Sequence, residues 1–164
     1  MDREQGKSVK YIDNNATVRN AGDVVRYHTR KVIHRQDVAN HTWNVMRIYT
    51  ERYGMPRAEV YKYMLYHDVA EVITGDIPFQ IKRNMPEFKE ASVEAELHAL
   101  YQLGIGPMEI TPDEIRKVKI CDLIEMHEYA IMEINYGNTL AIDIVDNIET
   151  ALKQMGETVD YIRK

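Results

Sequence analysis

A histidine interrupts the apolar face of a predicted helix, where it could bind a metal ion. His41 comes three residues after Val38 and four residues before Val45, so the three side chains share one face at the 3.6-residue period of a helix. An imidazole on such a face can be a hydrogen-bonded core residue or a metal ligand. His41 alone leaves both interpretations open.

Two further predicted helices also turn ionisable groups toward the interior. His67, Asp68 and Glu71 follow Met64 by three, four and seven residues, and Asp122 lies between apolar residues of a later helix at similar spacing. A His–Asp dipeptide such as His67–Asp68 often occurs by chance in proteins, so it is a weak signal. A buried Asp122 could pair with an arginine instead of a metal. Carboxylates are nonetheless rarely buried unless they are paired or bind a metal. One shared metal ion would account for all of these inward-facing groups.

Four of these residues, His41, His67, Asp68 and Asp122, suit a divalent cation. Two imidazoles and two carboxylates bind ions of intermediate hardness and leave positions for water and substrate, so we expect Co²⁺, Mn²⁺, Zn²⁺ or Mg²⁺. Such an ion lowers the pKa of a water bound to it and neutralises charge on a phosphoryl oxygen. Glu71 lies one helical turn after His67, where it could orient or deprotonate that water or protonate the leaving group.

Positive charge is concentrated just before the predicted His41 helix. Residues 26–35 include four Lys or Arg residues, although the net charge of the chain is −5. We expect most of them to be solvated, whereas Arg26 could hold a phosphate through its bidentate fork. Lys82 and Lys119 could also reach a phosphate. The sequence has no long basic stripe interleaved with aromatic residues, so we expect no stable nucleic-acid partner.

The elements that position these groups are predicted to be helices. Apolar residues recur at helical spacing, and strand-like alternation is not sustained anywhere. Residues 111–114 have the pattern of a capping box at a helix start. The apolar spacing of residues 60–72 predicts one continuous helix, which ends in a turn over 74–78 that contains Asp76. We expect an all-α, single-domain, compact bundle of about five or six helices over residues 1–164, with the first fifteen or so flexible.

Length and composition exclude several other classes of protein. A chain of 164 residues is long enough for one domain with a core that needs no disulfide. The single cysteine, Cys121, cannot form an internal disulfide, which fits a reducing compartment. We expect it to be a core residue rather than a nucleophile. No apolar run reaches the roughly 18 residues of a membrane helix. We therefore expect a cytoplasmic protein rather than a membrane, secreted, collagenous or disordered one.

The order of the candidate ligands resembles a known metal-binding pattern. His41, then His67–Asp68, then Asp122 is similar to the pattern of the HD-domain phosphohydrolases. Arg26 stands fifteen residues before His41. The run HDVAEVITGDIP covers residues 67–78, and Lys82 comes four residues after its end. This combination resembles the YfbR-like 5′-deoxynucleotidases over roughly residues 20 to 155.

The resemblance implies a fold, a cofactor and a role for each site residue. The fold is the all-helical HD domain, and the cofactor is one catalytic divalent metal ion. Glu71 is implied to be the acid/base residue, and Asp76 is implied to hold the sugar 3′-hydroxyl. The implied metal ligands are His41, His67, Asp68 and Asp122, and the implied phosphate-binding residues are Arg26, Lys82 and Lys119.

Chain length narrows the resemblance to one group of these enzymes. The sequence is similar in size to the short phage dATP triphosphohydrolases of the DatZ type, whose base pocket matches Tyr27, Thr29 and Pro78. The resemblance implies hydrolysis of dATP to deoxyadenosine by attack of hydroxide on phosphorus, in a homo-oligomer (a dimer or a hexamer) located in the cytoplasm of the host if a phage encodes it. Two alternatives are a 5′-deoxynucleotidase acting on monophosphates and a non-catalytic, nucleotide-sensing HD domain.

Overall fold

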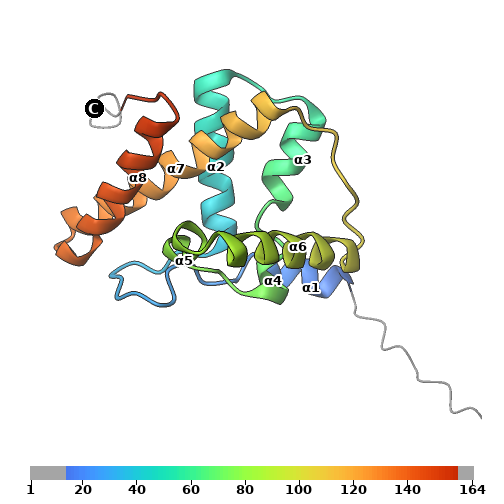
Figure 1. Ribbon diagram of the computed structural model, residues 1–164, viewed down its shortest axis with the longest axis horizontal. Coiled ribbons are helices and arrows are strands. Elements are labelled where there is room, and N and C mark those ends of the chain that lie inside the picture. The colour runs from blue at the N-terminus through green and yellow to red at the C-terminus, as the bar shows by residue number, and fades with distance from the viewer. Residues whose placement is uncertain (1–13, 159–164) are drawn as a thin grey trace, which may run out of the picture.

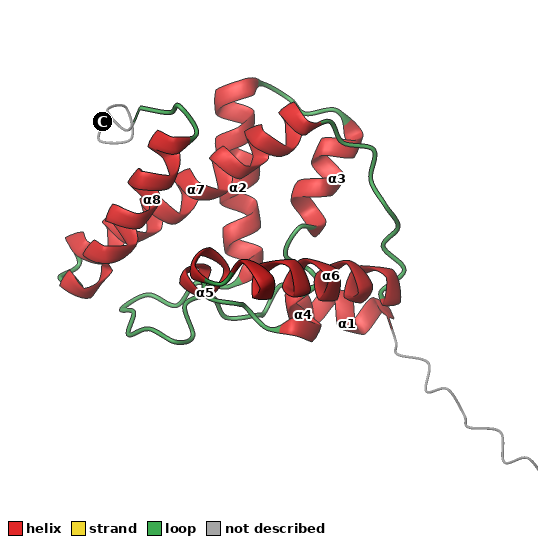
Figure 2. Cartoon of the chain, viewed as in Figure 1, coloured by secondary structure: helices red, strands yellow, loops and turns green. Residues whose placement is uncertain are grey.

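The computed structural model describes residues 14–158, which form helices joined by loops (Figure 1, Figure 2). Within this range one isolated β-bridge joins Val25 to Asp37. The all-α prediction is confirmed, and the expected five or six helices correspond to the six that span eight residues or more. We expected the first fifteen or so residues to be flexible, and residues 1–13 lie outside the described residues. The helices are α1 (Asn14–Ala21), α2 (Val38–Tyr53), α3 (Ala58–Tyr66), α4 (Glu71–Thr74), α5 (Phe79–Asn84), α6 (Pro86–Gln102), α7 (Pro112–Asn135), the 3-10 helix η1 (Thr139–Ala141) and α8 (Ile142–Gln154).

Four long helices form the main bundle. α7 packs against α2 and α8, and α2 packs against α3. The core between them contains fully buried large side chains, among them Met64, Ile120, Ile148 and Leu152. Each such side chain contributes about 1.5–3 kcal/mol when it leaves water, so this core holds the bundle together.

The other helices lie together across one end of this bundle. Figure 1 shows α1, α4, α5 and α6 beneath the lower end of α2, and contacts join α4 to α1 and α6, and α5 to α6. A smaller core, which includes Ala21, Val69 and Leu103, lies among these elements. The loop between α1 and α2 and the turn between α3 and α4 run where the two layers meet. Both connections contain residues predicted to form the site.

α7 is the central helix of the fold. Between Ile120 and Ala130 all its side chains are buried except that of Glu128. Its start has the predicted capping box, because the Glu114 N–H donates to Thr111 Oγ1 at 3.3 Å and the Thr111 N–H donates to Glu114 Oε2 at 2.8 Å. α7 spans 24 residues. No helix of residues 14–158 combines the length and apolarity needed to cross a membrane.

Replacing the residue that caps α7 is expected to destabilise the fold without altering the site. In Thr111→Ala the side chain that accepts the Glu114 N–H is lost, and removal of such a cap costs about 1 kcal/mol of the free energy of unfolding. Urea denaturation followed by circular dichroism measures this change. Metal content should stay at the wild-type value, and a loss of metal in this variant would show that the cap has a role at the site.

The expectation of one continuous helix over residues 60–72 is wrong. α3 ends at Tyr66, residues 67–70 form a turn, and α4 begins at Glu71. In the turn the N–H of Val69 donates to the carbonyl of Tyr66 at 3.2 Å, and the N–H of Glu71 donates to the carbonyl of Asp68 at 3.0 Å. These three-residue bonds wind the chain more tightly than an α-helix does. Local apolar spacing contains no signal for this break in the helix. In the structure Asp68 of the turn and Glu71 at the start of α4 line the same pocket.

Candidate metal and nucleotide site

Three helices bring the predicted metal ligands together. His41 lies in the first turn of α2, His67 and Asp68 follow the last turn of α3, and Asp122 lies on α7. One ligand atom each from His41, His67 and Asp122 lies within 4.8 Å of the other two. Asp68 Oδ2 lies 3.4 Å from Nε2 of both histidines, and Asp122 Oδ1 lies 3.2 Å from His41 Nε2. Three of the four predicted ligands thus form one cluster, and Asp68 lies beside both of its histidines.

The second nitrogen of each imidazole is engaged elsewhere, which fixes the orientation of both rings. His67 Nδ1 donates to the carbonyl oxygen of Met64 at 2.6 Å. His41 Nδ1 lies 2.5 Å from Oε2 of the buried Glu125, which also accepts from Gln36. The Nε2 atoms of both histidines are buried and have no hydrogen-bond partner among the described residues. Two lone pairs aimed at a pair of carboxylates fit a metal ion well.

The electrostatic environment of His41 also favours a cation. Burial and the nearby charge of Arg26 lower the pKa of this imidazole, but the carboxylates of Asp122 and Glu125 raise it by more, to about 9. Positive charge beside Nε2 is therefore stabilised, whether a proton or a metal ion supplies it. The donor set, the orphaned nitrogens and the local potential all fit a divalent ion.

Glu71 is placed as a candidate proton carrier beside this cluster. It begins α4, and its Oε2 atom is buried without a hydrogen-bond partner among the described residues. Burial and the charge of Asp68 raise the pKa of the Glu71 carboxyl to about 8. A carboxyl group whose pKa lies near neutrality can both accept and release a proton during turnover.

Three cations predicted to bind phosphate line one pocket beside the cluster, and each has a carboxylate partner. Arg26 Nη1 donates to Asp68 Oδ2 at 2.6 Å, and Lys119 Nζ donates to Asp122 Oδ2 at 2.5 Å. Lys82 Nζ donates to Glu96 Oε1 at 2.7 Å. Arg26 is buried, and its Nε atom has no hydrogen-bond partner among the described residues. The Nε–H of Arg26 is thus an unsatisfied buried donor beside the cluster.

One pocket collects ten of the twelve predicted site residues. The other two, His41 and His67, reach it through the contacts of their Nε2 atoms with Asp68. Lys31 and Arg35 of the basic stretch lie outside the pocket, as expected for solvated residues. The ten residues are Arg26, Tyr27, Thr29, Asp68, Glu71, Asp76, Pro78, Lys82, Lys119 and Asp122.

Tyr27 and Asp76 support each other at the edge of the pocket. The Tyr27 N–H donates to Asp76 Oδ2 at 3.1 Å, and the Tyr27 backbone has a φ of 57°, in the left-handed region. Its ring stacks on Tyr129 of α7 with the centroids 4.8 Å apart. Gly75, with a φ of 75°, reverses the chain after α4 and brings Asp76 to this position. Residues 75–78, where we expected a turn, form an irregular segment, and Asp76, Ile77 and Pro78 line the pocket.

Comparison with known proteins places this chain in a family. A family model described as 5′-deoxynucleotidase YfbR-like matches residues 15–103. The chain belongs to the YfbR-like family of HD phosphohydrolases. The matched segment of this YfbR-like chain runs from α1 to the end of α6, so it contains the first three predicted ligands, whereas Asp122 and Lys119 come from α7 beyond it.

Individual relatives of the YfbR-like chain support the fold. A dATP triphosphohydrolase of cyanophage S-2L is 29% identical over 111 residues, which are 64% of this chain and 62% of that protein, less than two thirds of either. A structure of the cyanophage S-2L HD phosphohydrolase DatZ, bound to dA and one catalytic Zn²⁺ ion, has a TM-score of 0.65 at 20% identity and covers 93% of this chain and 91% of its own. A protein of Pyrococcus horikoshii OT3 has a TM-score of 0.62 at 22% identity, with 92% of both chains covered. At these identities the structural matches show the HD fold.

Sequence reasoning missed several residues of the YfbR-like site. Glu125 lies three residues after Asp122 on the same helix, and this spacing was a signal that could have revealed it. Arg30 was grouped with the solvated basic residues, but it lines the pocket and pairs with Asp143 at 2.8 Å. α8 contributes a further wall for which the sequence has no local signal. Its lining residues are Ile144, Asn147 and Ile148.

Proposed function

We propose that this protein is a metal-dependent phosphohydrolase of 2′-deoxynucleotides, with dATP as its substrate. The observation that carries the proposal is a single pocket that is lined by Asp68, Asp122, Glu71 and three cations, with His41 and His67 in contact with its Asp68 carboxylate. The relative described as a dATP triphosphohydrolase, and the related structure that contains dA and Zn²⁺, support this choice of substrate.

The ligand cluster would hold one divalent ion through His41, His67, Asp68 and Asp122. When bound, the ion supplies charge neutralisation at a phosphoryl oxygen and acidifies water. Glu125 holds the His41 ring so that Nε2 faces this position. Each carboxylate ligand also contacts a cation that could bind phosphate, so ligands and phosphate-binding residues form one connected cluster.

Glu71 carries out the proton transfer in the proposed reaction. As the oxygen of water forms its bond to the α-phosphorus of dATP, Glu71 accepts the proton, and the bond from phosphorus to the 5′-oxygen breaks. Glu71 then gives this proton to the 5′-oxygen, and the products are deoxyadenosine and triphosphate. Arg26, Lys82 and Lys119 bind the phosphate oxygens, where fixed positive charge stabilises the negative charge that develops during transfer.

The sugar and base would lie against the pocket wall formed by the loop after α1 and the turn after α4. Asp76 is positioned to accept a hydrogen bond from the sugar 3′-hydroxyl while it holds the backbone of Tyr27. Tyr27, Thr29 and Pro78 would contact the base and the sugar. The stacking of Tyr27 on Tyr129 gives this wall a fixed shape.

Removal of the Asp76 carboxylate is expected to abolish recognition of the 3′-hydroxyl. The wild-type protein should hydrolyse dATP with a kcat/KM about 10- to 100-fold above that for 2′,3′-dideoxy-ATP, because a hydrogen bond to a charged group contributes about 1.5–3 kcal/mol. Asp76→Ala should reduce this ratio to near one by slowing dATP. An unchanged ratio would exclude Asp76 from sugar binding.

A substrate panel tests the function and separates it from its alternatives. Purified protein is incubated with Zn²⁺, Mn²⁺, Co²⁺ or Mg²⁺ and with dATP, dAMP, ATP, AMP and the other deoxynucleotides, and the products are separated by chromatography. Release of triphosphate from dATP supports the proposal. Turnover of monophosphates alone would indicate a 5′-deoxynucleotidase, the description of the matching family model. Equal turnover of ribonucleotides would remove the deoxy preference, and no turnover with any metal would indicate a sensing domain.

We also propose that the protein acts as a homo-oligomer, a dimer or a hexamer, in the cytoplasm. Large apolar side chains are exposed on α2 and α6, and a second copy could cover them. Examples are Trp43, Leu97 and Tyr101, at 64%, 62% and 79% exposure. Sedimentation velocity tests the state of assembly, and a monomer at all concentrations would contradict it.

A further inference from the structure

Two buried glutamates on α7 have no place in the reaction steps proposed above. Glu125 is 2% exposed and Glu133 is 0% exposed. Asp122, Glu125, Tyr129 and Glu133 stand three, four and four residues apart, so their side chains follow one face of α7. A buried carboxylate is costly unless donors surround it, and therefore its donors show which segment it holds in place.

Glu125 is bonded on the metal side of the site. Its Oε2 lies 2.5 Å from His41 Nδ1, and its Oε1 accepts from Gln36 Nε2 at 2.7 Å. An anionic acceptor keeps the proton of the imidazole on Nδ1 and leaves the Nε2 lone pair for a metal ion. Both hydrogen bonds are buried, so water does not compete for them.

Glu133 is bonded on the nucleotide side of the site. Oε2 accepts the Ile33 N–H, Oε1 accepts the His34 N–H, and Asn138 Nδ2 donates to Oε2, each at 2.7 Å. His34 Nδ1 lies 3.2 Å from Oε1. Burial alone would raise the pKa of Glu133, but these hydrogen bonds lower it below its ordinary value, so the group remains an anion. Its donors belong to the loop between α1 and α2 and to the segment after α7.

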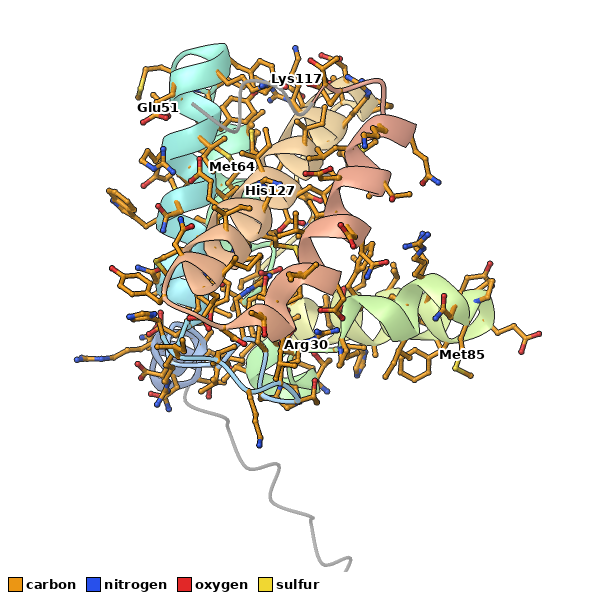
Figure 3. All side chains as sticks on the ribbon, turned by 90° about the vertical axis from the view of Figure 1, so that its left-hand side faces the viewer. Arg30, Glu51, Met64, Met85, Lys117 and His127 are labelled. Carbon is orange, nitrogen blue, oxygen red and sulfur yellow. The ribbon has the colours of Figure 1, made fainter. Side chains whose placement is uncertain are left out.

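The loop that Glu133 holds is the one that lines the nucleotide pocket. It begins with Arg26 and Tyr27, and the β-bridge between Val25 and Asp37 closes its base. Figure 3 shows Arg30 of this loop where α8 meets the layer of α5 and α6. Tyr129, between the two glutamates on α7, donates to the carbonyl of His34 at 2.5 Å and stacks on the Tyr27 ring.

We propose that α7 positions the site through two separable carboxylates: Glu125 directs His41 toward the metal ion, and Glu133 holds the loop of residues 26–36 in the shape that contacts the nucleotide. The metal half rests on the metal site of the proposed function and the nucleotide half rests on its substrate, whereas the shape of the loop rests on neither. Both glutamates are positioning residues, since neither lines the pocket. The two roles are distinct because each carboxylate bonds to a different segment.

Glutamine substitutions test this division with little change in volume. In Glu133→Gln an amide NH₂ replaces one of the two oxygens, so it faces either the His34 N–H or both the Ile33 N–H and Asn138 Nδ2, and at least one hydrogen bond is lost. In Glu125→Gln the single remaining oxygen serves either His41 or Gln36. Each variant serves as the control of the other. Glu128→Gln, on the exposed face of α7, is the matched surface control.

Three readouts separate the two roles, and two of them need no nucleotide. Titration of metal-free protein with Zn²⁺ against a chromophoric chelator should show about 10- to 100-fold weaker binding for Glu125→Gln and none of this loss for Glu133→Gln. Amide hydrogen exchange over residues 29–34 should be about 10-fold faster in Glu133→Gln and unchanged in Glu125→Gln. In a Glu71→Gln background, the dissociation constant for dATP should rise about 10-fold with Glu133→Gln.

The outcomes distinguish this proposal from the proposed function. If the Glu71→Gln protein binds no dATP, the proposed substrate is wrong, while zinc titration and hydrogen exchange still decide the positioning roles. If both variants change zinc affinity and loop exchange alike, or if neither changes either quantity, the division of roles is wrong. A fall in the unfolding midpoint with no selective change in these readouts would show that both glutamates serve stability alone.

Discussion

Replacing Glu71 by glutamine is expected to slow hydrolysis of dATP by about 10²- to 10⁴-fold, while metal and nucleotide still bind. The substitution keeps the shape of a buried side chain whose Oε2 has no hydrogen-bond partner among the described residues, so the fold should tolerate it. It removes the carboxyl group whose pKa is raised to about 8 by burial and by the charge of Asp68. An amide cannot accept the proton of the attacking water. Single-turnover assays with saturating dATP measure the loss directly.

A matched control separates this effect from a general change of charge. Glu94→Gln removes one negative charge from the exposed surface of α6. Glu94 does not line the pocket, so this variant should retain the wild-type rate. The metal content of both variants should equal that of the wild type by elemental analysis. If Glu71→Gln kept its rate, another group would handle the water, and the role assigned to Glu71 would be wrong.

Replacing Asp122 by alanine is expected to remove the metal ion and, with it, the activity. Asp122 is 8% exposed, its Oδ1 lies 3.2 Å from His41 Nε2, and its Oδ2 accepts from Lys119. Loss of this carboxylate leaves an uncompensated positive charge at the cluster, which repels a divalent ion. Loss of a residue that only supports a ligand typically weakens metal binding by about 10- to 100-fold, and we expect zinc affinity to fall by more than this.

Elemental analysis after dialysis checks the Asp122→Ala prediction, and the hydrolysis assay runs alongside it. Asp146→Ala, an exposed aspartate on α8, is the matched control and should keep both metal and activity. Asp122→Ala protein that retained stoichiometric metal would show that Asp122 is no ligand. Metal-free protein that still hydrolysed dATP would contradict the metal-dependent mechanism as a whole.

The ligand cluster was accessible from the sequence because its signals are local. Helical spacing alone turned His41 and Asp122 inward, and the order of residues along the chain gave the resemblance to HD phosphohydrolases. The break between α3 and α4 was not accessible in this way, since apolar spacing runs smoothly through residues 60–72. Side-chain periodicity indicates which face of a helix is buried. It does not indicate where hydrogen bonds from residue i to residue i−3 replace those from residue i to residue i−4.

The partners of the charged groups were also beyond the sequence. His41 and Glu125 are 84 positions apart, and Ile33 and Glu133 are 100 apart, so tertiary packing alone brings them together. The sequence predicts phosphate binding by Arg26, Lys82 and Lys119 but does not indicate that each of them contacts a carboxylate. If these residues bind phosphate as proposed, it shares the cations with the carboxylates already present.

The central claim, metal-dependent hydrolysis of dATP in this pocket, is tested most directly by phosphorus NMR of dATP during incubation with the purified protein and Zn²⁺, Mn²⁺, Co²⁺ or Mg²⁺. The account predicts that the three dATP resonances give way to those of inorganic triphosphate, and that Glu71→Gln and Asp122→Ala block this change. A spectrum of dATP that stays unchanged with every metal, or hydrolysis that persists in both variants, would contradict it.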